Sequence, residues 1–286
     1  MEPVLNISVI KVNGNFADPC DDKVAAEEPL EIRLNYQTPT GRKVKSISVT
    51  MRTPGNDADL VTGFLYSEGI VRQASDVDAI AHLSEEKENV VVMRLCDNVV
   101  PDLGKLERNF YTTSSCGVCG KSSIEAVRTE CEIIDTKDSI VIQPVVLCAL
   151  PDKLRNSQKM FESTGAIHAC ALFDTNGNLI MLMEDVGRHN ALDKLVGASL
   201  MAGMLPANEH ILLLSGRASF ELIQKAAMAG IKIVAAVGAP SSLAVQMAEE
   251  WGMTLVGFLR GTRFNIYAGG HRIGYTYPSG TKAGNE

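Results

Sequence analysis

The alternation of strand-like and helical segments in the second half of the chain constrains its fold more than any other feature. From about residue 165, "AIHACALFD" and "NLIMLMED" are typical of two strands, joined by Thr175-Asn176-Gly177, an Asn-Gly hairpin signal. The helical "GRHNALDKLVGASLMAGM" follows, and then the strands "HILLLSG", "IKIVAAVGA" and "MTLVGFLRG" alternate with two more helices. This pattern predicts an α/β domain, a mainly parallel sheet covered by helices on both faces.

The first half of the chain is dominated by short strands. "EIRLNY" (31–36), "KVKSISVTM" (43–51) and "ENVVVMRLC" (88–96) predict strands, whereas "NDADLVTGFLYSEGI" (56–70) predicts one amphipathic helix. We therefore divide the chain into a smaller β-rich α+β domain (1–110), a flexible loop with two cysteines (111–123), a connecting segment (124–164) and the α/β domain (165–286).

Composition excludes several classes of protein. The chain has 286 residues and a formal net charge of −7, which argues against binding nucleic acid through bulk positive charge. No run approaches the ~18 apolar residues that span a membrane, and "MEPVLNISVI" lacks the pattern of a signal peptide. We expect a cytoplasmic protein with neither nucleic-acid nor membrane partners, whose scattered cysteines form no disulfide framework.

Glycines, hydroxyls and arginines follow three predicted strands where those strands end. In open α/β sheets, ligands bind beyond the carboxyl ends of the strands. Two of these loops lead directly into helices, whose N-termini favour anions. One guanidinium group can also bind two phosphate oxygens at once. We expect the three arginines to converge on a phosphate-bearing ligand, although ordinary turn glycines and solvated arginines are the alternative. The segments are Ser215-Gly216-Arg217, residues 238–242 and Phe258-Leu259-Arg260-Gly261-Thr262-Arg263.

"EDVGRHNALDKL" (184–195) forms a second polar cluster. Asp185 is placed to cap a helix that carries Arg188 and His189 in its first turn. His189 is a candidate ligand-binding residue, although a lone histidine is more often structural. His168 lies within an apolar strand, and we expect it in the core.

"TTSSCGVCGKSS" (112–123) places Cys116 and Cys119 three positions apart. A structural zinc site needs four ligands, and no second such pair exists, so we expect no metal. A catalytic disulfide pair would lie between a strand and a helix, a context this segment lacks. "SCGVCGKS" is a near miss to a phosphate-binding loop, with Ser115 where the first glycine belongs.

The remaining interpretation is that this segment presents an exposed nucleophilic thiol. The Ser122–Glu125 spacing predicts that a helix begins just after the cysteines. A helix N-terminus and a neighbouring lysine, here Lys121, both lower a thiol's pKa and favour the reactive thiolate. Such a thiol can hold a terminal sulfur atom as a persulfide.

Several long motifs together resemble the formate dehydrogenase accessory sulfurtransferase family, FdhD. They run in order from about residue 28 to 267, which is most of the chain. They are "RNFYTTSSCGVCGKSSIEAV", "TGAIHACALFD", "EDVGRHNALDKLVG", "LSGRASFELIQKAAMAGI" and "GFLRGTRFNIY".

The resemblance implies a sulfur carrier. Cys116 would accept persulfide sulfur from a cysteine desulfurase, with Cys119 assisting its transfer. The sulfur would pass to the molybdenum of a bis(molybdopterin guanine dinucleotide) cofactor before that cofactor enters formate dehydrogenase. The segment from Phe258 to Arg263 matches part of the family's guanine-dinucleotide site, and family analogy also suggests a homodimer.

The resemblance further implies a cytidine-deaminase-like, three-layer C-terminal domain. His189 would occupy a zinc-ligand position, but the catalytic glutamate and the paired cysteines of such deaminases are missing, so zinc-dependent deamination is not expected. Two other functions stay open. One is a cofactor-binding chaperone without sulfur chemistry, and the other is a thiol-disulfide oxidoreductase.

Overall fold

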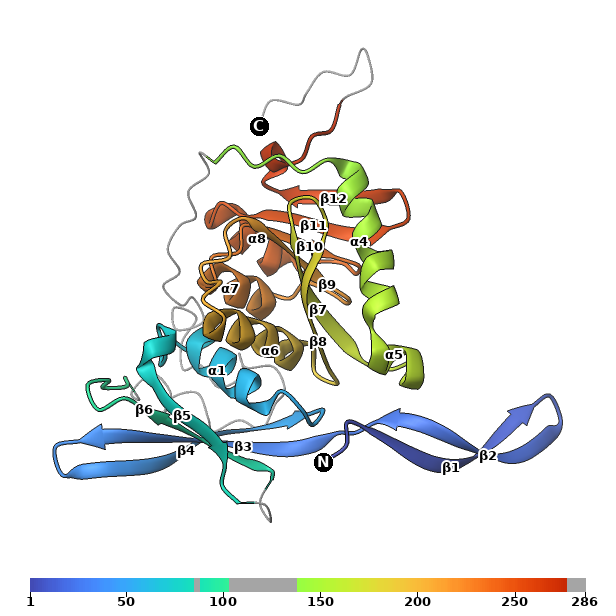
Figure 1. Cartoon of the computed structure of the whole chain (residues 1–286). Helices are drawn as coiled ribbons and strands as arrows, with labels where there is room; N and C mark the ends of the chain where they lie inside the picture. The colour runs from blue at the N-terminus through green and yellow to red at the C-terminus, as the bar shows by residue number, and fades with distance from the viewer. Residues whose placement is uncertain (85–87, 103–137, 277–286) are drawn as a thin grey trace.

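The computed structural model describes residues 1–84, 88–102 and 138–276, and Cys116, Cys119 and the helix expected after Ser122 lie outside these ranges. The described residues form three sheets of two, four and six strands (Figure 1). The six-stranded sheet and its helices form the larger body. The four-stranded sheet lies below this body in the view, and the two-stranded hairpin projects to one side.

The six-stranded sheet has the strand order β12-β11-β10-β9-β7-β8. Only the neighbouring pairs β9–β10 and β10–β11 are parallel, and the other three pairs are antiparallel, so our expectation of a mainly parallel sheet is wrong. The Asn-Gly hairpin makes β7 and β8 antiparallel, β7 is antiparallel to β9, and β12 returns antiparallel along β11. The strands are β7 (His168–Asp174), β8 (Leu179–Asp185), β9 (His210–Leu214), β10 (Ile233–Ala236), β11 (Thr254–Arg260) and β12 (Arg263–Ala268).

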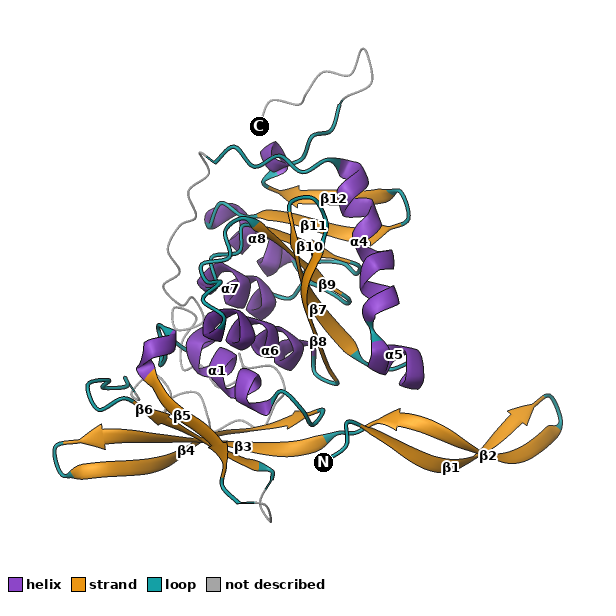
Figure 2. Cartoon of the chain, in the orientation of Figure 1, coloured by secondary structure: helices purple, strands orange, loops and turns teal. Residues whose placement is uncertain are grey.

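Helices cover both faces of this sheet, as expected (Figure 2). One face carries α6 (Arg188–Met201), α7 (Phe220–Met228) and α8 (Ser242–Glu250), and the other carries α4 (Pro144–Ser157). Strand residues alternate between the two faces, with Leu172 among the residues packed on the three-helix side and Phe173 among those packed on the α4 side. The three-layer architecture is present, whereas the specific cytidine-deaminase layout stays a prediction.

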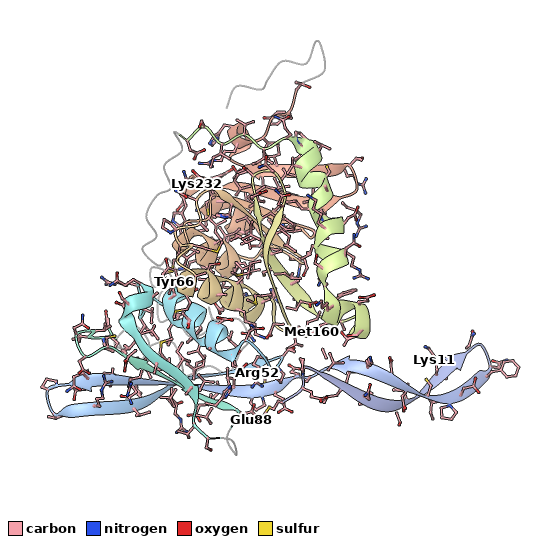
Figure 3. The ribbon with its side chains drawn as sticks, viewed as in Figure 1. Lys11, Arg52, Tyr66, Glu88, Met160 and Lys232 are labelled. Carbon is pink, nitrogen blue, oxygen red and sulfur yellow. The ribbon has the colours of Figure 1, made fainter. Side chains whose placement is uncertain are left out.

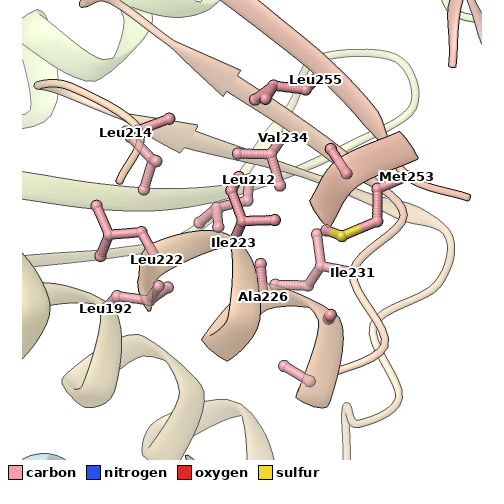
Figure 4. Packing of buried hydrophobic residues seen from close by; sticks show 14 of the residues in the cluster. Leu192, Leu212, Leu214, Leu222, Ile223, Ala226, Ile231, Val234, Met253 and Leu255 are labelled. Carbon is pink, nitrogen blue, oxygen red and sulfur yellow. The ribbon is translucent and has the colours of Figure 1, made fainter. Parts of the chain in front are cut away.

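The core on the three-helix side is built from branched apolar side chains of neighbouring strands. Figure 4 shows Leu212 and Val234, from β9 and β10, close to Ile223 and Ala226 of α7. All four are essentially inaccessible to solvent. Burying each such side chain contributes roughly 1.5–3 kcal/mol, so this packing holds the strand ends in fixed positions.

The residues before β7 extend the three-layer body. We placed residues 124–164 in a connecting segment, but α4 buries Leu147, Leu150 and Leu154 against the sheet. The shorter α5 (Lys159–Thr164) follows α4 and lies against β2. This body therefore begins before residue 165.

A charged cluster around Asp138 fixes the chain before α4 to the end of the sheet at which β10 begins. Asp138 accepts hydrogen bonds from Arg272, which is fully buried, and from Lys232. Burial raises the pKa of Asp138, but the hydrogen bonds from Arg272 and Lys232 outweigh it and hold that pKa well below its usual range. Asp138 therefore stays ionised and ties the chain to the start of β10.

The N-terminal domain is a four-stranded sheet with one helix packed on it. Its strand order is β4-β3-β6-β5, and the predicted strands at 31–36, 43–51 and 88–96 are confirmed within it. The expected helix is α1, and the short η1 (Ala74–Asp76) precedes β5. The elements are β3 (Glu28–Thr38), β4 (Gly41–Arg52), α1 (Asp57–Ser67), β5 (Val77–His82) and β6 (Val90–Leu95).

A two-stranded hairpin, β1 (Val4–Asn13) and β2 (Phe16–Ala25), precedes this sheet. Short strands were expected here, but each of these has ten residues. The short 3₁₀ helix η3 (Gly270–Arg272) ends the described elements after β12.

Helices α1 and α6 join the two bodies through a close contact between glycines. A Cβ on Gly63 would lie 1.9 Å from the carbonyl oxygen of Asp193, and a Cβ on Gly197 would lie 2.0 Å from that of Asp59. The two backbones could not approach this closely with any larger residue.

A buried ion pair makes the second connection between the bodies. Lys194 Nζ, on α6, lies 2.7 Å from Asp185 Oδ2, and neither side chain is more than 2% exposed. The backbone of Thr53 is bonded to both: its N–H donates to Asp185 Oδ2 at 3.1 Å, and its carbonyl accepts from Lys194 Nζ at 2.8 Å. The residue that follows β4 is thereby fixed to the end of β8 and to α6.

We predict that Lys194→Met destabilises the whole protein. The variant leaves the Asp185 carboxylate buried without its cation, a loss that typically costs about 3–5 kcal/mol. Urea unfolding followed by circular dichroism measures it. Glu88→Gln, which removes a partly exposed partner of the Met1 ammonium, is the control and should cost much less, because solvent screens an exposed pair. Equal costs for the two variants would contradict the role of the buried pair.

Candidate functional site

The carboxyl ends of β9, β10 and β11 lie next to one another at one end of the six-stranded sheet, which we call the strand edge. Gly238 donates its N–H to the carbonyl of Gly216 at 2.9 Å and accepts from the N–H of Phe258 at 3.0 Å. A Cβ on Gly238 would lie 3.0 Å from the carbonyl carbon and oxygen of Gly216, so a larger residue would require this backbone to shift by a few tenths of an ångström. The structure therefore brings together Gly216, the 238–242 segment and Phe258, as the sequence predicted.

His168 lies at this same edge, because β7 runs antiparallel to β9 and begins where β9 ends. A Cβ on Gly216 would be 3.4 Å from His168 Nδ1. We expected His168 in the core, but it is half-buried. Burial and the nearby Arg188, His189 and Arg217 lower the pKa of His168, so its imidazole is neutral near pH 7.

Ser215 has a mainly structural role at this edge. Its hydroxyl accepts a hydrogen bond from the N–H of Ala169 at 2.8 Å, and its own N–H donates to the carbonyl of Ala169. This pair continues the β7–β9 ladder beyond the end of β9 and holds His168 beside Gly216.

Arg188 and His189 lie in the first turn of helix α6, at the site. Gly187 is its N-cap, so the expectation that Asp185 caps the helix is wrong. Asp185 instead accepts from the N–H of Gly187 at 2.8 Å while it pairs with Lys194. The buried ion pair therefore sets the position of the first turn of α6.

His189 connects the first turns of α6 and α7. Its Nε2 lies 3.4 Å from both Ser219 Oγ and Glu221 Oε2. The hydrogen bond from His189 lowers the pKa of Glu221 to about 2, against a smaller opposing effect of burial. Glu221 is thus ionised at neutral pH and orients the imidazole. The sequence analysis missed Glu221, although an acidic residue in a first helical turn is a recognisable signal.

Positive charge concentrates around these two helix starts. Arg188 and Arg217 both act electrostatically on His168, which places them near it. The Nε of Arg188 is buried and has no hydrogen-bond partner among the residues that the structure describes. A buried donor without a partner costs about 1–3 kcal/mol, which an anion at this position would recover. The helix N-termini favour the same charge.

The β11–β12 hairpin extends beyond this edge. Phe258 has a φ of 53° and is half-exposed, and Arg260 and Arg263 are exposed and face each other across the hairpin. Gly261, with a φ of 56°, and Thr262 make the turn between them. Leu259 is fully buried on the α4 side, so its side chain anchors the hairpin. Convergence of Arg260 and Arg263 with Arg217 on one ligand stays a prediction.

A cavity of about 600 Å³ lies elsewhere, at the start of α1, and is lined by residues that include Arg52, Asp57, His82 and Glu88. Its main charges are already paired. Arg52 bonds Asp57 through two contacts of 2.9 Å, and Glu88 bonds the Met1 ammonium at 2.9 Å. We therefore place the candidate site at the strand ends, where a buried donor is unpaired.

Two features are absent from the described ranges. No group of three or more histidine, cysteine, aspartate or glutamate side chains there is placed to hold a metal ion. No helix in that part of the chain is long and apolar enough to cross a membrane.

The fold and the site thus define an α/β protein whose strand edge carries positive charge and a buried donor without a partner among the described residues. A model of the FdhD/NarQ family matches residues 25–274, and the chain belongs to that family.

Curated relatives match over nearly their whole length. "Sulfur carrier protein FdhD" of Streptomyces avermitilis is 51% identical over 93% of this chain and 94% of that protein. The protein of the same name from Mycobacterium tuberculosis is 46% identical over 88% of this chain and 92% of its own length.

One solved structure shares the fold. It is a crystal structure from Desulfotalea psychrophila, provisionally described as a formate dehydrogenase accessory protein. The TM-score is 0.73, with 95% of this chain and 99% of that chain covered at 23% sequence identity.

We predict that Glu221 makes the stability of the protein pH-dependent. Its folded pKa of about 2 lies below its ordinary value of 4.5, so the unfolded state binds more protons between these values. The contribution of ionised Glu221 to the free energy of unfolding is fully present above about pH 4.5 and is lost as the pH falls towards 2. Urea unfolding at pH 6 and pH 3.5 measures this loss, which Glu221→Gln should reduce. If the exposed control Glu249→Gln reduces it equally, the His189 contact is not its source.

Proposed function

We propose that this chain is a sulfur carrier with sulfurtransferase activity that serves formate dehydrogenase. A cysteine desulfurase loads Cys116 with a terminal sulfur atom as a persulfide, and Cys119 assists its release. The sulfur passes to the molybdenum of bis(molybdopterin guanine dinucleotide), which is the substrate of the transfer, before the cofactor enters formate dehydrogenase. The reaction takes place in the cytoplasm.

The observation that carries this proposal is the positive charge at the strand edge, where the buried Nε of Arg188 has no hydrogen-bond partner among the described residues. The substrate carries phosphate groups, and Arg188, Arg217 and the N-termini of α6 and α7 match their charge. Arg260, Gly261, Thr262 and Arg263 extend that surface beyond the strand ends. The name sulfur carrier protein, borne by relatives about half identical to this chain, supports the same assignment.

Two of the cysteines that the structure describes, Cys148 and Cys170, are poorly suited to carry sulfur. Burial raises the pKa of the Cys170 thiol far above its usual value and also raises that of Cys148. A thiol that stays protonated is a poor nucleophile and a poor acceptor of sulfur. Cys116, by contrast, precedes Lys121 by five positions in a stretch of the sequence rich in glycine and serine.

We predict that Cys116→Ser abolishes the ability of the protein to support formate dehydrogenase activity. Incubation with an active cysteine desulfurase should add about 32 Da, one sulfur atom, to the peptide that holds Cys116. Cys96→Ser is the matched control, because Cys96 is a free, partly exposed thiol, and it should leave both readouts unchanged. A fully active Cys116→Ser protein would instead support a cofactor-binding chaperone.

We also predict that guanosine diphosphate, a fragment of the substrate, binds at the strand edge. Removing a guanidinium that bonds a phosphate costs about 1.5–3 kcal/mol, so Arg217→Ala and Arg260→Ala should each weaken binding about tenfold or more. Isothermal titration calorimetry measures it, with the exposed Arg72→Ala as control. Unchanged affinity in both site variants would remove this edge from the proposal.

A thiol-disulfide oxidoreductase is the remaining alternative, and it makes a different prediction. It requires a Cys116–Cys119 disulfide that forms and breaks at accessible potentials. A redox titration of the two thiols therefore separates it from sulfur transfer.

A further inference from the structure

His189 and Glu221 form a carboxylate–imidazole pair at the strand edge. The Nε2 of His189 lies 3.4 Å from Glu221 Oε2 and from Ser219 Oγ, so this ring nitrogen faces the start of α7. Glu221 is ionised at neutral pH and has only acceptor oxygens, so the hydrogen between the two groups is carried by Nε2. The contact therefore fixes which nitrogen of the neutral ring holds the proton.

The other ring nitrogen of His189, Nδ1, has no hydrogen-bond partner among the described residues. Because the two nitrogens lie on different sides of the ring, Nδ1 is directed away from Glu221. In the neutral imidazole Nδ1 can only accept a hydrogen bond, since Nε2 holds the single proton. It becomes a donor only when the ring takes up a second proton and carries a positive charge.

The two other carboxylates near this turn of α6 already have lysine partners. Asp193, one turn further along the helix, accepts from Lys225 Nζ at 2.7 Å, and Asp185 pairs with Lys194 at the same distance. Glu221 has no lysine or arginine partner within the part of the chain that the structure describes. Glu221 is therefore the carboxylate available to balance a positive charge on the imidazole.

Arg188, Arg217 and His168 are the other groups that oppose or share a charge with His189. His168 is neutral near pH 7, and Cys170 of the same strand stays protonated because burial raises the pKa of its thiol. The two arginines disfavour a second proton on His189 while the strand edge holds no anion. A bound phosphate group would neutralise them, so the proton and the phosphate favour each other.

The remaining elements packed on α6 add no free charge beside the imidazole. On α1, Asp57 pairs with Arg52, Asp59 accepts from the side chain of the N-cap residue, and Tyr66 donates its hydroxyl to a backbone carbonyl of α7. Figure 3 labels Arg52 and Tyr66. On β8, Glu184 accepts from two backbone N–H groups of α5.

We propose that His189 binds a phosphate group of the ligand through Nδ1 as an imidazolium, and that Glu221 is the positioning residue that keeps the other proton on Nε2. Binding then takes up one proton from the solvent, and release of the ligand returns it. This inference rests on the proposed function, from which it takes the phosphate-bearing ligand at the strand edge. It adds that the protein holds this ligand more tightly at lower pH.

Isothermal titration calorimetry measures the proton uptake directly when the same binding reaction is repeated in buffers of different ionisation enthalpy. The probe is diguanosine diphosphate, in which a pyrophosphate joins two guanosines, because the terminal phosphate of guanosine diphosphate itself titrates at about pH 6. At pH 8 the wild-type chain should take up about one proton for each probe bound. Its dissociation constant should correspondingly rise about tenfold for each pH unit above neutrality.

Three variants assign the proton. His189→Gln keeps a side-chain donor that cannot titrate, so it should bind the probe with no proton uptake and with the same affinity at pH 7 and pH 8. Glu221→Gln should take up less proton than the wild type, because its amide can donate to Nε2 and leave the hydrogen of the neutral ring on Nδ1. His168→Gln should keep the wild-type uptake, since His168 is already neutral. A purely structural role of Glu221 would leave the proton uptake unchanged.

The outcomes separate this inference from the proposed function. Wild-type binding without proton uptake overturns the inference and leaves the proposed function in place. Full uptake in His189→Gln assigns the proton to another group and also overturns it. Absence of probe binding at every pH from 6 to 8.5 overturns the proposed function, and the inference with it. If a variant fails to fold by circular dichroism, the wild-type measurement still decides.

Discussion

The buried ion pair between Lys194 and Asp185 is the interaction on which the rest of the structure depends. Its two partners also hold the backbone of Thr53, and Asp185 holds the N–H of Gly187 at the start of α6. Asn190 extends the link by donating to the carbonyl of Met51 at 2.7 Å. A charge pair this deeply buried has a strict geometry, because a displaced partner would remain desolvated without compensation. The N-terminal sheet and the first turn of α6 are therefore held as one unit.

The site follows from that unit and from the sheet topology. Parallel β9, β10 and β11 end at one edge, and the antiparallel β7 begins there, so His168 meets Gly216 and Arg217. Helices α6 and α7 both begin at this edge, and the contact between His189 and Glu221 aligns their first turns. Net positive charge remains at this edge because the carboxylate of Glu221 offsets only part of the charge of Arg188 and Arg217. The buried Nε of Arg188, which has no partner among the described residues, favours this edge over the cavity beside Arg52 as a place for an anionic ligand.

Sequence reasoning recovered what depends on local pattern. The strands from "AIHACALFD" to "MTLVGFLRG", the intervening helices and the glycine loops at 216 and 238 all lie where periodicity placed them. It failed where pairing between distant segments decides the outcome. The direction of β7 against β9 made the sheet mixed and brought His168 to the site. Asp185 resembled a helix cap, but its long-range pairing with Lys194 and Thr53 determines its role. The length of the β1–β2 hairpin had no local signal in the sequence, because most of its side chains are exposed.

A crystal structure of the chain with bound guanosine diphosphate tests the central claim most directly. The account predicts that the phosphate oxygens lie within hydrogen-bonding distance of Arg188 or Arg217, beside the first turns of α6 and α7. Nucleotide density confined to the cavity lined by Arg52 and His82, with the strand edge empty, would contradict it.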